Sequence, residues 1–173
     1  MLSAGAPRFR PEQDLLARNG YVVLHTDYRN HAGSDDAPDN DVNLRLGYTE
    51  DVINAVHALR SAARPNVDDG RIGLLGRSMG GGVVYNALVV APGLGGGGKA
   101  PHKAPTAPGP HPRRTGTADD TCPLAWTRAT VAAFEAAGKD VELRTYRGEG
   151  HTFGPRWPDS MDTTMAFFER RLR

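Results

Sequence analysis

The sequence predicts an α/β fold, a mostly parallel sheet flanked by helices. Tyr21–Thr26 is β-rich and nearly continuously apolar, as a strand buried on both faces is. Gly47–Arg64 then carries apolar residues at helical spacing, and Arg71–Leu75 forms a second short apolar run. Strand, helix and strand in this order predict a βαβ unit with a parallel strand pair and a right-handed crossover.

Length and composition limit the class of protein. At 173 residues the chain is expected to form one domain. Its 21 basic and 20 acidic residues nearly cancel, so the charge predicts neither a nucleic acid nor a membrane as partner. No secretory signal is visible at the N-terminus, and we expect a cytoplasmic protein. The single cysteine, Cys122, excludes an internal disulfide and is more typical of a packing residue than of a nucleophile.

The remaining elements follow from periodicity and turn residues. Residues 1–14 show no period and are expected to be a loose lead-in. Leu15–Asn19 fits the end of a helix, with Gly20 as its C-cap. A polar loop rich in Asn, Asp and Gly follows the first strand. Downstream, the pattern predicts three helices and one strand with a single buried face. The helices are Gly80–Val90, Pro123–Ala137 and Pro158–Arg173, and the strand is Asp140–Tyr146.

Residues 92–115 interrupt this pattern. They contain six prolines, six glycines, no acidic residue and Leu94 as the one large apolar side chain. Such a stretch cannot bury enough apolar surface to offset the entropy of ordering it, so we expect a linker or disordered insert. Its sharp edges also fit a second hypothesis, a gene segment read in a shifted frame between Gly93 and Gly116, which translation of the other two frames would test.

The motif with the clearest chemistry is Gly76-Arg77-Ser78-Met79-Gly80, a G-x-S-x-G pattern between the second strand and a helix. A serine at such a turn has its hydroxyl held clear of the backbone. The flanking glycines let strand and helix approach closely. The alternative is a glycine-rich turn with a spectator serine.

A nucleophilic serine needs a general base, which in turn needs an acid to orient it. His151 is the expected base, because it is the histidine that lies late in the chain and just past a strand, and the alternative is a solvated loop residue. The other five lie in the first strand, a polar loop, the crossover helix and the insert: His25, His31, His57, His102 and His111.

Two adjacent aspartates, Asp119 and Asp120, lie between the serine and His151 and precede a helix. One of them is expected to orient the histidine, and the other to cap the helix. Glu149 is less suited, because a residue two positions away seldom points at the same imidazole nitrogen.

A tetrahedral intermediate also needs two hydrogen-bond donors. The backbone N–H of Met79, directly after the serine, is the expected first donor, whereas the sequence identifies no second one. Arg29 is either a substrate-binding residue or an ordinary loop arginine.

Four ordered blocks resemble the catalytic domain of the prolyl oligopeptidase family of serine peptidases. They read GYVVLHTDYRNHAGSD, NVDDGRIGLLGRSMGG, GTADDTCP and AAGKDVELRTYRGEGHTF. The resemblance implies an α/β-hydrolase fold, here truncated at the N-terminus and interrupted mid-chain, and hydrolysis of peptide or sometimes ester bonds through an acyl-enzyme. Ser78 would be the nucleophile, Asp119 the acid and His151 the base, with no cofactor and no metal.

Two alternatives stay open. One is a carboxylesterase-type hydrolase acting on a small ester, and the other is a non-catalytic fragment that keeps the motif without the activity. Neither the substrate-binding residues nor the oligomeric state can be predicted from the sequence.

Overall fold

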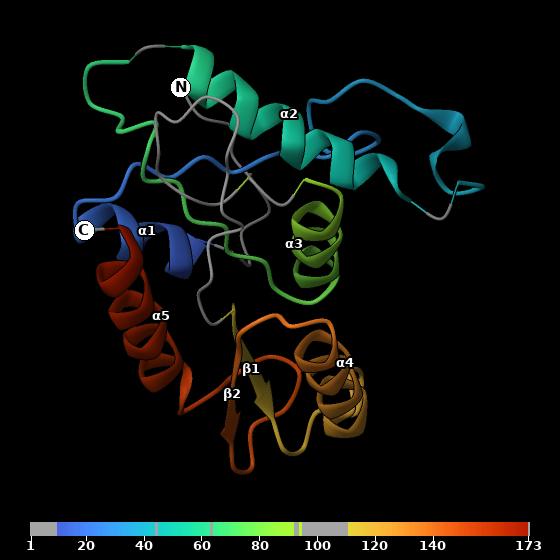
Figure 1. The fold of residues 1–173 in the computed structure, drawn as a ribbon, viewed down its shortest axis with the longest axis vertical. Coiled ribbons are helices and arrows are strands. Elements are labelled where there is room, and N and C mark those ends of the chain that lie inside the picture. The colour runs from blue at the N-terminus through green and yellow to red at the C-terminus, as the bar shows by residue number, and fades with distance from the viewer. Residues whose placement is uncertain (1–9, 44, 63, 92–93, 95–110, 173) are drawn as a thin grey trace. The chain divides into compact units, whose positions relative to one another are not determined.

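Two groups of elements follow one another along the chain (Figure 1). The structure, a computed structural model, describes residues 10–43, 45–62, 64–91, 94 and 111–172. Its contacts divide the chain into two compact units, Met1–Ala104 and Pro105–Arg173. The boundary falls inside the predicted insert, and the expectation of one domain stays a prediction.

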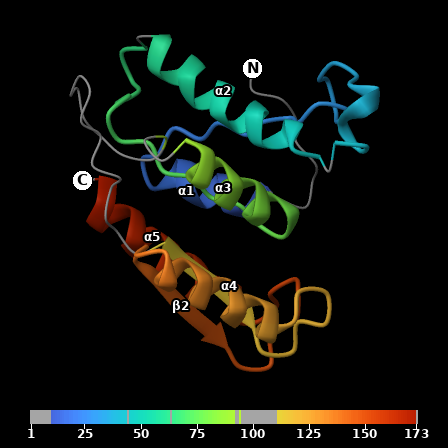
Figure 2. The same cartoon turned by 45° about the vertical axis from the view of Figure 1, so that its right-hand side comes forward.

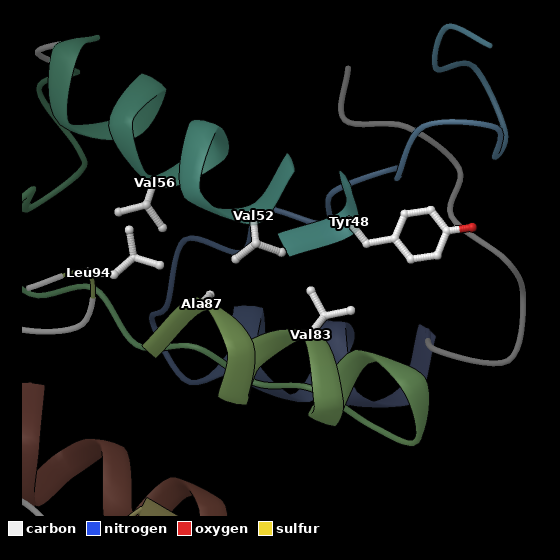
Figure 3. Close-up of a cluster of buried hydrophobic side chains, with 6 residues drawn as sticks. All are labelled: Tyr48, Val52, Val56, Val83, Ala87 and Leu94. Carbon is white, nitrogen blue, oxygen red and sulfur yellow. The ribbon is translucent and has the colours of Figure 1, made fainter. Parts of the chain in front are cut away.

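The core of the first unit lies between helices α2, Gly47–Ser61, and α3, Met79–Val90. Apolar residues at i and i+4 spacing give each helix one buried stripe. Three glycines near the start of α3 are poor helix formers, so this helix depends on its packing against α2. The cluster, drawn in Figure 3, consists of Tyr48, Val52, Val56, Val83, Ala87 and Leu94.

A further helix, α1, spans Arg10–Arg18 and begins within the segment expected to be a loose lead-in. That expectation is therefore wrong for residues 10–14, and residues 1–9 lie outside the described part of the chain. The helix carries few apolar residues, but Leu16 is buried. The helix end predicted near Leu15–Asn19 is confirmed, since α1 ends at Arg18 and Gly20 has a positive φ of 85°. The first turn of the helix is polar and too short to show a period in the sequence.

The two predicted strands of the first unit are not assigned as strands. Among the described residues, Tyr21–Thr26 and Arg71–Leu75 belong to neither a helix nor a sheet. Ile72 and Leu74 pack against the core, whereas Val22 and Leu24 are exposed. Burial on both faces, expected for Tyr21–Thr26, is thus wrong. An apolar run predicts a strand, but it does not supply the partner that a hydrogen-bonded ladder needs.

The second unit is built on two parallel strands, β1, His111–Gly116, and β2, Val141–Tyr146. They pair in register from His111 opposite Val141 to Gly116 opposite Tyr146. Helix α4, Leu124–Ala136, connects them and packs against both strands (Figure 2). Helix α5, Trp157–Leu172, packs against β1. This is the β-α-β order expected for an α/β protein.

Strand β1 corrects the expectation of a linker or insert over residues 92–115. Residues 111–115 pair with β2, and Thr115 is buried. The sequence HPRRTG has no apolar pattern, so pairing and not intrinsic preference makes it a strand. Leu94 is also ordered and lies in the core of the first unit, while residues 92–93 and 95–110 lie outside the described residues.

The buried side chains of α4 and α5 recur at helical spacing, as expected, and some of them are polar. Thr127 and Val131 are buried on α4, and Met161 and Phe168 on α5. Thr164 is also buried, and its hydroxyl donates to the carbonyl oxygen of Ser160 at 2.8 Å. On β2 the expected alternation fails at its end, where position 145 is exposed and Tyr146 is buried. None of the described helices is long and apolar enough to cross a membrane.

Substituting Val83 with alanine tests the α2–α3 core. Val83 is 6% exposed, and Val89 on the same helix is 67% exposed. We expect Val83→Ala to lower the free energy of unfolding by about 2 kcal/mol, because it removes buried methyl groups and leaves a cavity. Urea unfolding measures the change. Val89→Ala is the matched control and should stay within about 0.5 kcal/mol of the wild type.

Candidate active site

Ser78 has an unusual backbone conformation. It is the residue before α3, with φ 54° and ψ −124°, and it is exposed. A positive φ in a residue with a Cβ costs on the order of 1–3 kcal/mol and persists only where the surroundings enforce it. Strain of this kind is what the sharp strand-to-helix turn of a G-x-S-x-G motif imposes on its serine.

The turn is enforced by close approach of the backbone at its two glycines. A Cβ added at Gly76 would collide with the backbone of Gly80. The N–H groups of Gly81 and Gly82 both donate to the carbonyl oxygen of Ser78, at 2.9 and 3.4 Å. These hydrogen bonds begin α3 directly after the serine. The N–H of Met79 belongs to the first turn of α3, where helical N–H groups have no acceptor within the helix.

Neighbouring segments of the first unit hold both sides of the turn. Nη1 of Arg77 donates to the carboxylate of Glu12 on α1 at 3.0 Å. The hydroxyl of Tyr28 lies 3.6 Å from the Cβ position of Gly80, and its ring stacks on Tyr48 at 4.9 Å. Burial, with the nearby Asp51 carboxylate, raises the pKa of the Tyr28 phenol. The contact of Tyr28 with this turn cannot be predicted from the sequence, because Tyr28 belongs to no recognisable motif.

The second unit brings Asp119 and His151 together. Nδ1 of His151 lies 3.1 Å from both carboxylate oxygens of Asp119. Asp119 is 8% exposed and His151 26% exposed at the side chain. Asp119 follows β1 by three residues, and His151 follows β2 by five. Because β1 and β2 are parallel and in register, the two loops leave the sheet at the same end.

The electrostatics of the pair fix its protonation. Burial alone would raise the pKa of Asp119, but the N–H of Cys122, the hydrogen-bonded His151 and the N–H of Thr121 together hold it below its ordinary value of 3.8. The two N–H groups donate to Oδ1 at 2.7 and 3.0 Å. An ionised carboxylate only accepts hydrogen bonds, so Nδ1 of His151 carries the hydrogen. In the neutral imidazole the lone pair then lies on Nε2, as a general base requires.

Asp120 does not share this arrangement. Its carboxylate accepts a hydrogen bond from the Thr121 hydroxyl at 3.3 Å, and α4, whose N-cap is Pro123, begins without a side-chain cap hydrogen bond. The expectation that one aspartate caps this helix is therefore wrong. Both oxygens of Glu149 accept N–H groups of its own loop, from Gly154 and Arg156.

Other candidates have structural partners. Arg29 donates to Asp51 through Nε and Nη2 and to Glu50 through Nη2, with distances of 2.8–3.2 Å. These ion pairs tie the loop after residue 26 to α2. Nε2 of His31 lies 3.0 Å from the hydroxyl of Tyr48. Within the described residues, no group of three His, Cys, Asp or Glu side chains is placed to hold a metal ion.

The sequence-predicted residues thus fall into two sets. Ser78 and Met79 form a strained turn at the start of α3 in the first unit, and Asp119 and His151 form a hydrogen-bonded pair in the second. The first set offers a hydroxyl and a helix N-terminus, and the second offers an oriented imidazole. Together these groups are the chemical components of a serine nucleophile with its base and acid.

Comparison with known proteins gives one match. A family model described as the alpha/beta hydrolase family matches residues 4–172, nearly the whole chain. No curated protein and no solved structure matches the sequence.

Gly76→Ala tests the close approach at the turn. The added Cβ would meet the backbone of Gly80, which cannot move aside without unwinding the first turn of α3. We expect the free energy of unfolding to fall by about 1–3 kcal/mol, as in other overpacked sites. Gly82 lies in the first turn of α3, and a Cβ added there would point into open space. We therefore expect Gly82→Ala to leave the free energy of unfolding unchanged or to raise it by up to about 1 kcal/mol. Equal losses in both variants would contradict the enforced turn.

Asp119→Asn tests the charge of the pair. Because folding lowers the pKa of Asp119, its ionised form stabilises the protein above the ordinary pKa, and this stabilisation is lost as the pH falls through the folded value. We expect the free energy of unfolding of the wild type to exceed that of Asp119→Asn by about 1–3 kcal/mol at neutral pH. This difference should shrink toward zero in acid, where Asp119 is protonated. Urea unfolding over a pH series measures it, with Asp120→Asn as the control. A difference that is independent of pH would contradict the assignment.

Proposed function

Because the chain belongs to the alpha/beta hydrolase family, we propose that it is a serine hydrolase that cleaves peptide bonds through an acyl-enzyme on Ser78. The family supports a hydrolase, and the peptide substrate and the three catalytic residues are our proposal. The observation that carries it is the positive φ of Ser78. A spectator serine would gain nothing from a strained backbone, whereas a nucleophile needs its hydroxyl held clear of the chain.

In the proposed reaction, Oγ of Ser78 attacks the carbonyl carbon of the scissile bond while Nε2 of His151 takes the hydroxyl proton. The carbonyl oxygen becomes an oxyanion, to which the N–H of Met79 donates. The intermediate collapses as the imidazolium gives its proton to the leaving amine, and the acyl group stays on Ser78. Water, deprotonated by the same nitrogen, then attacks the acyl carbon, and the imidazolium returns the proton to Oγ of Ser78 as the acid leaves. Asp119 stabilises the imidazolium throughout.

The peptide substrate rests on the four sequence blocks that resemble prolyl oligopeptidase-type catalytic domains. Ester cleavage would use the same residues, so only substrates separate the two activities. Hydrolysis of a p-nitrophenyl ester without cleavage of peptides would make the chain a carboxylesterase-type hydrolase.

Covalent labelling with a fluorophosphonate tests the nucleophile. The reagent phosphonylates a serine only where a base activates it, so we expect labelling at Ser78, located by mass spectrometry of the digested chain. Ser78→Ala should abolish it and His151→Ala should slow it by at least about 10³-fold. Ser61→Ala, at the exposed end of α2, should label like the wild type. If the folded wild type takes up no reagent, Ser78 is not an activated nucleophile and the chain is the non-catalytic alternative.

A further inference from the structure

We propose that Glu149 is a positioning residue, whose buried carboxylate holds the loop that carries His151 so that Nδ1 faces Asp119. The inference rests on the proposed function, in which His151 is the general base. It gives a role to a buried acid that the proposed chemistry does not use.

Glu149 is 5% exposed, and its carboxylate binds main-chain N–H groups further along the loop after β2. One oxygen accepts the N–H of Gly154, and the other accepts the N–H of Arg156 at 3.0 Å. His151 lies between the residues joined in this way. The carboxylate therefore links the chain before His151 to the chain after it. Hydrogen bonds to a charged acceptor are stronger than those to a neutral one, so this link restrains the loop.

The main chain of Glu149 fastens the same loop to the loop that carries Asp119. Its carbonyl oxygen accepts the N–H of Ala118 at 2.9 Å, one residue before the acid. A Cβ at Gly116 would collide with this carbonyl, so a glycine there permits the contact. A second link runs from the N–H of Gly148 to the hydroxyl of Thr117 at 2.9 Å.

Glu149 thus joins the two loops through its main chain and shapes one of them through its side chain. The main-chain contacts fix the distance between the loops near the strands. The side-chain contacts fix the path of the chain beyond His151, where the ring of Phe153 returns to lie 5.1 Å from that of Tyr146. An imidazole between two fixed points has few orientations, and misplacing a catalytic group by about 1 Å can cost about 100-fold in rate.

The chemistry requires a carboxylate in this place. Two N–H donors converge on it, and a carboxylate offers acceptors on both oxygens. Glutamine has the same shape, but its amide nitrogen would face one of the N–H groups, donor against donor. Glu149→Gln therefore breaks one contact while leaving the size of the side chain unchanged.

The test measures the histidine directly. In the wild type, the Nδ1 hydrogen of His151, held by Asp119, should give a far-downfield proton NMR resonance that disappears in Asp119→Asn. We expect Glu149→Gln to shift or broaden this resonance and to lower kcat for a p-nitrophenyl ester between about 10-fold and 100-fold, with KM nearly unchanged. Glu135→Gln, an exposed residue of α4, is the matched control and should leave both readouts unchanged.

A folded Glu149→Gln protein with the wild-type resonance would overturn the proposal, whatever its rate. If this variant does not fold, Glu149→Asp, which keeps the charge but shortens the reach, takes its place with the same two outcomes. The resonance requires neither Ser78 nor turnover. A wild type that takes up no fluorophosphonate would therefore refute the proposed function while the NMR measurement still decides the role of Glu149.

Discussion

The parallel register of β1 and β2 is the constraint on which the acid and the base both depend. Gly116 lies opposite Tyr146, so the loops that follow the two strands start side by side. Asp119 and His151 meet because each lies a few residues beyond that common edge. The strands are short, and α4 and α5 pack against them, so the position of the pair is set by the fold of the second unit.

At the turn of Ser78 the constraint is steric. Gly76 lies so close to the backbone of Gly80 that a residue with a Cβ would collide there, and α3 begins directly after Ser78. A positive φ in a residue with a Cβ persists only where the surrounding packing enforces it, and α3, which begins at this turn, packs against α2. A helix that starts with several glycines would not form alone, so the core of the first unit and the strained turn support each other.

Much of this arrangement could be predicted from the sequence. Periodicity placed α2 to α5 to within a few residues, because each helix buries a regular stripe of side chains. It also placed β2, although the alternation of that strand fails at Thr145. It missed β1, whose residues HPRRTG become a strand only through a partner distant in sequence. It also assigned strands at Tyr21–Thr26 and Arg71–Leu75, where apolar runs lack a paired ladder among the described residues. The contacts of Glu149 could not be predicted, because they depend on the path of the loop after β2 and not on a periodic spacing of residues.

The central claim is that Ser78 is acylated with His151 as its base. Its most direct measurement is the mass of the chain, quenched in acid during turnover of p-nitrophenyl acetate and then digested. The account predicts one acetyl group per chain, on Ser78, in the wild type, and a strongly reduced amount in His151→Gln. Ester cleavage with no acetyl group on Ser78, or with the acetyl group on another residue, would contradict it.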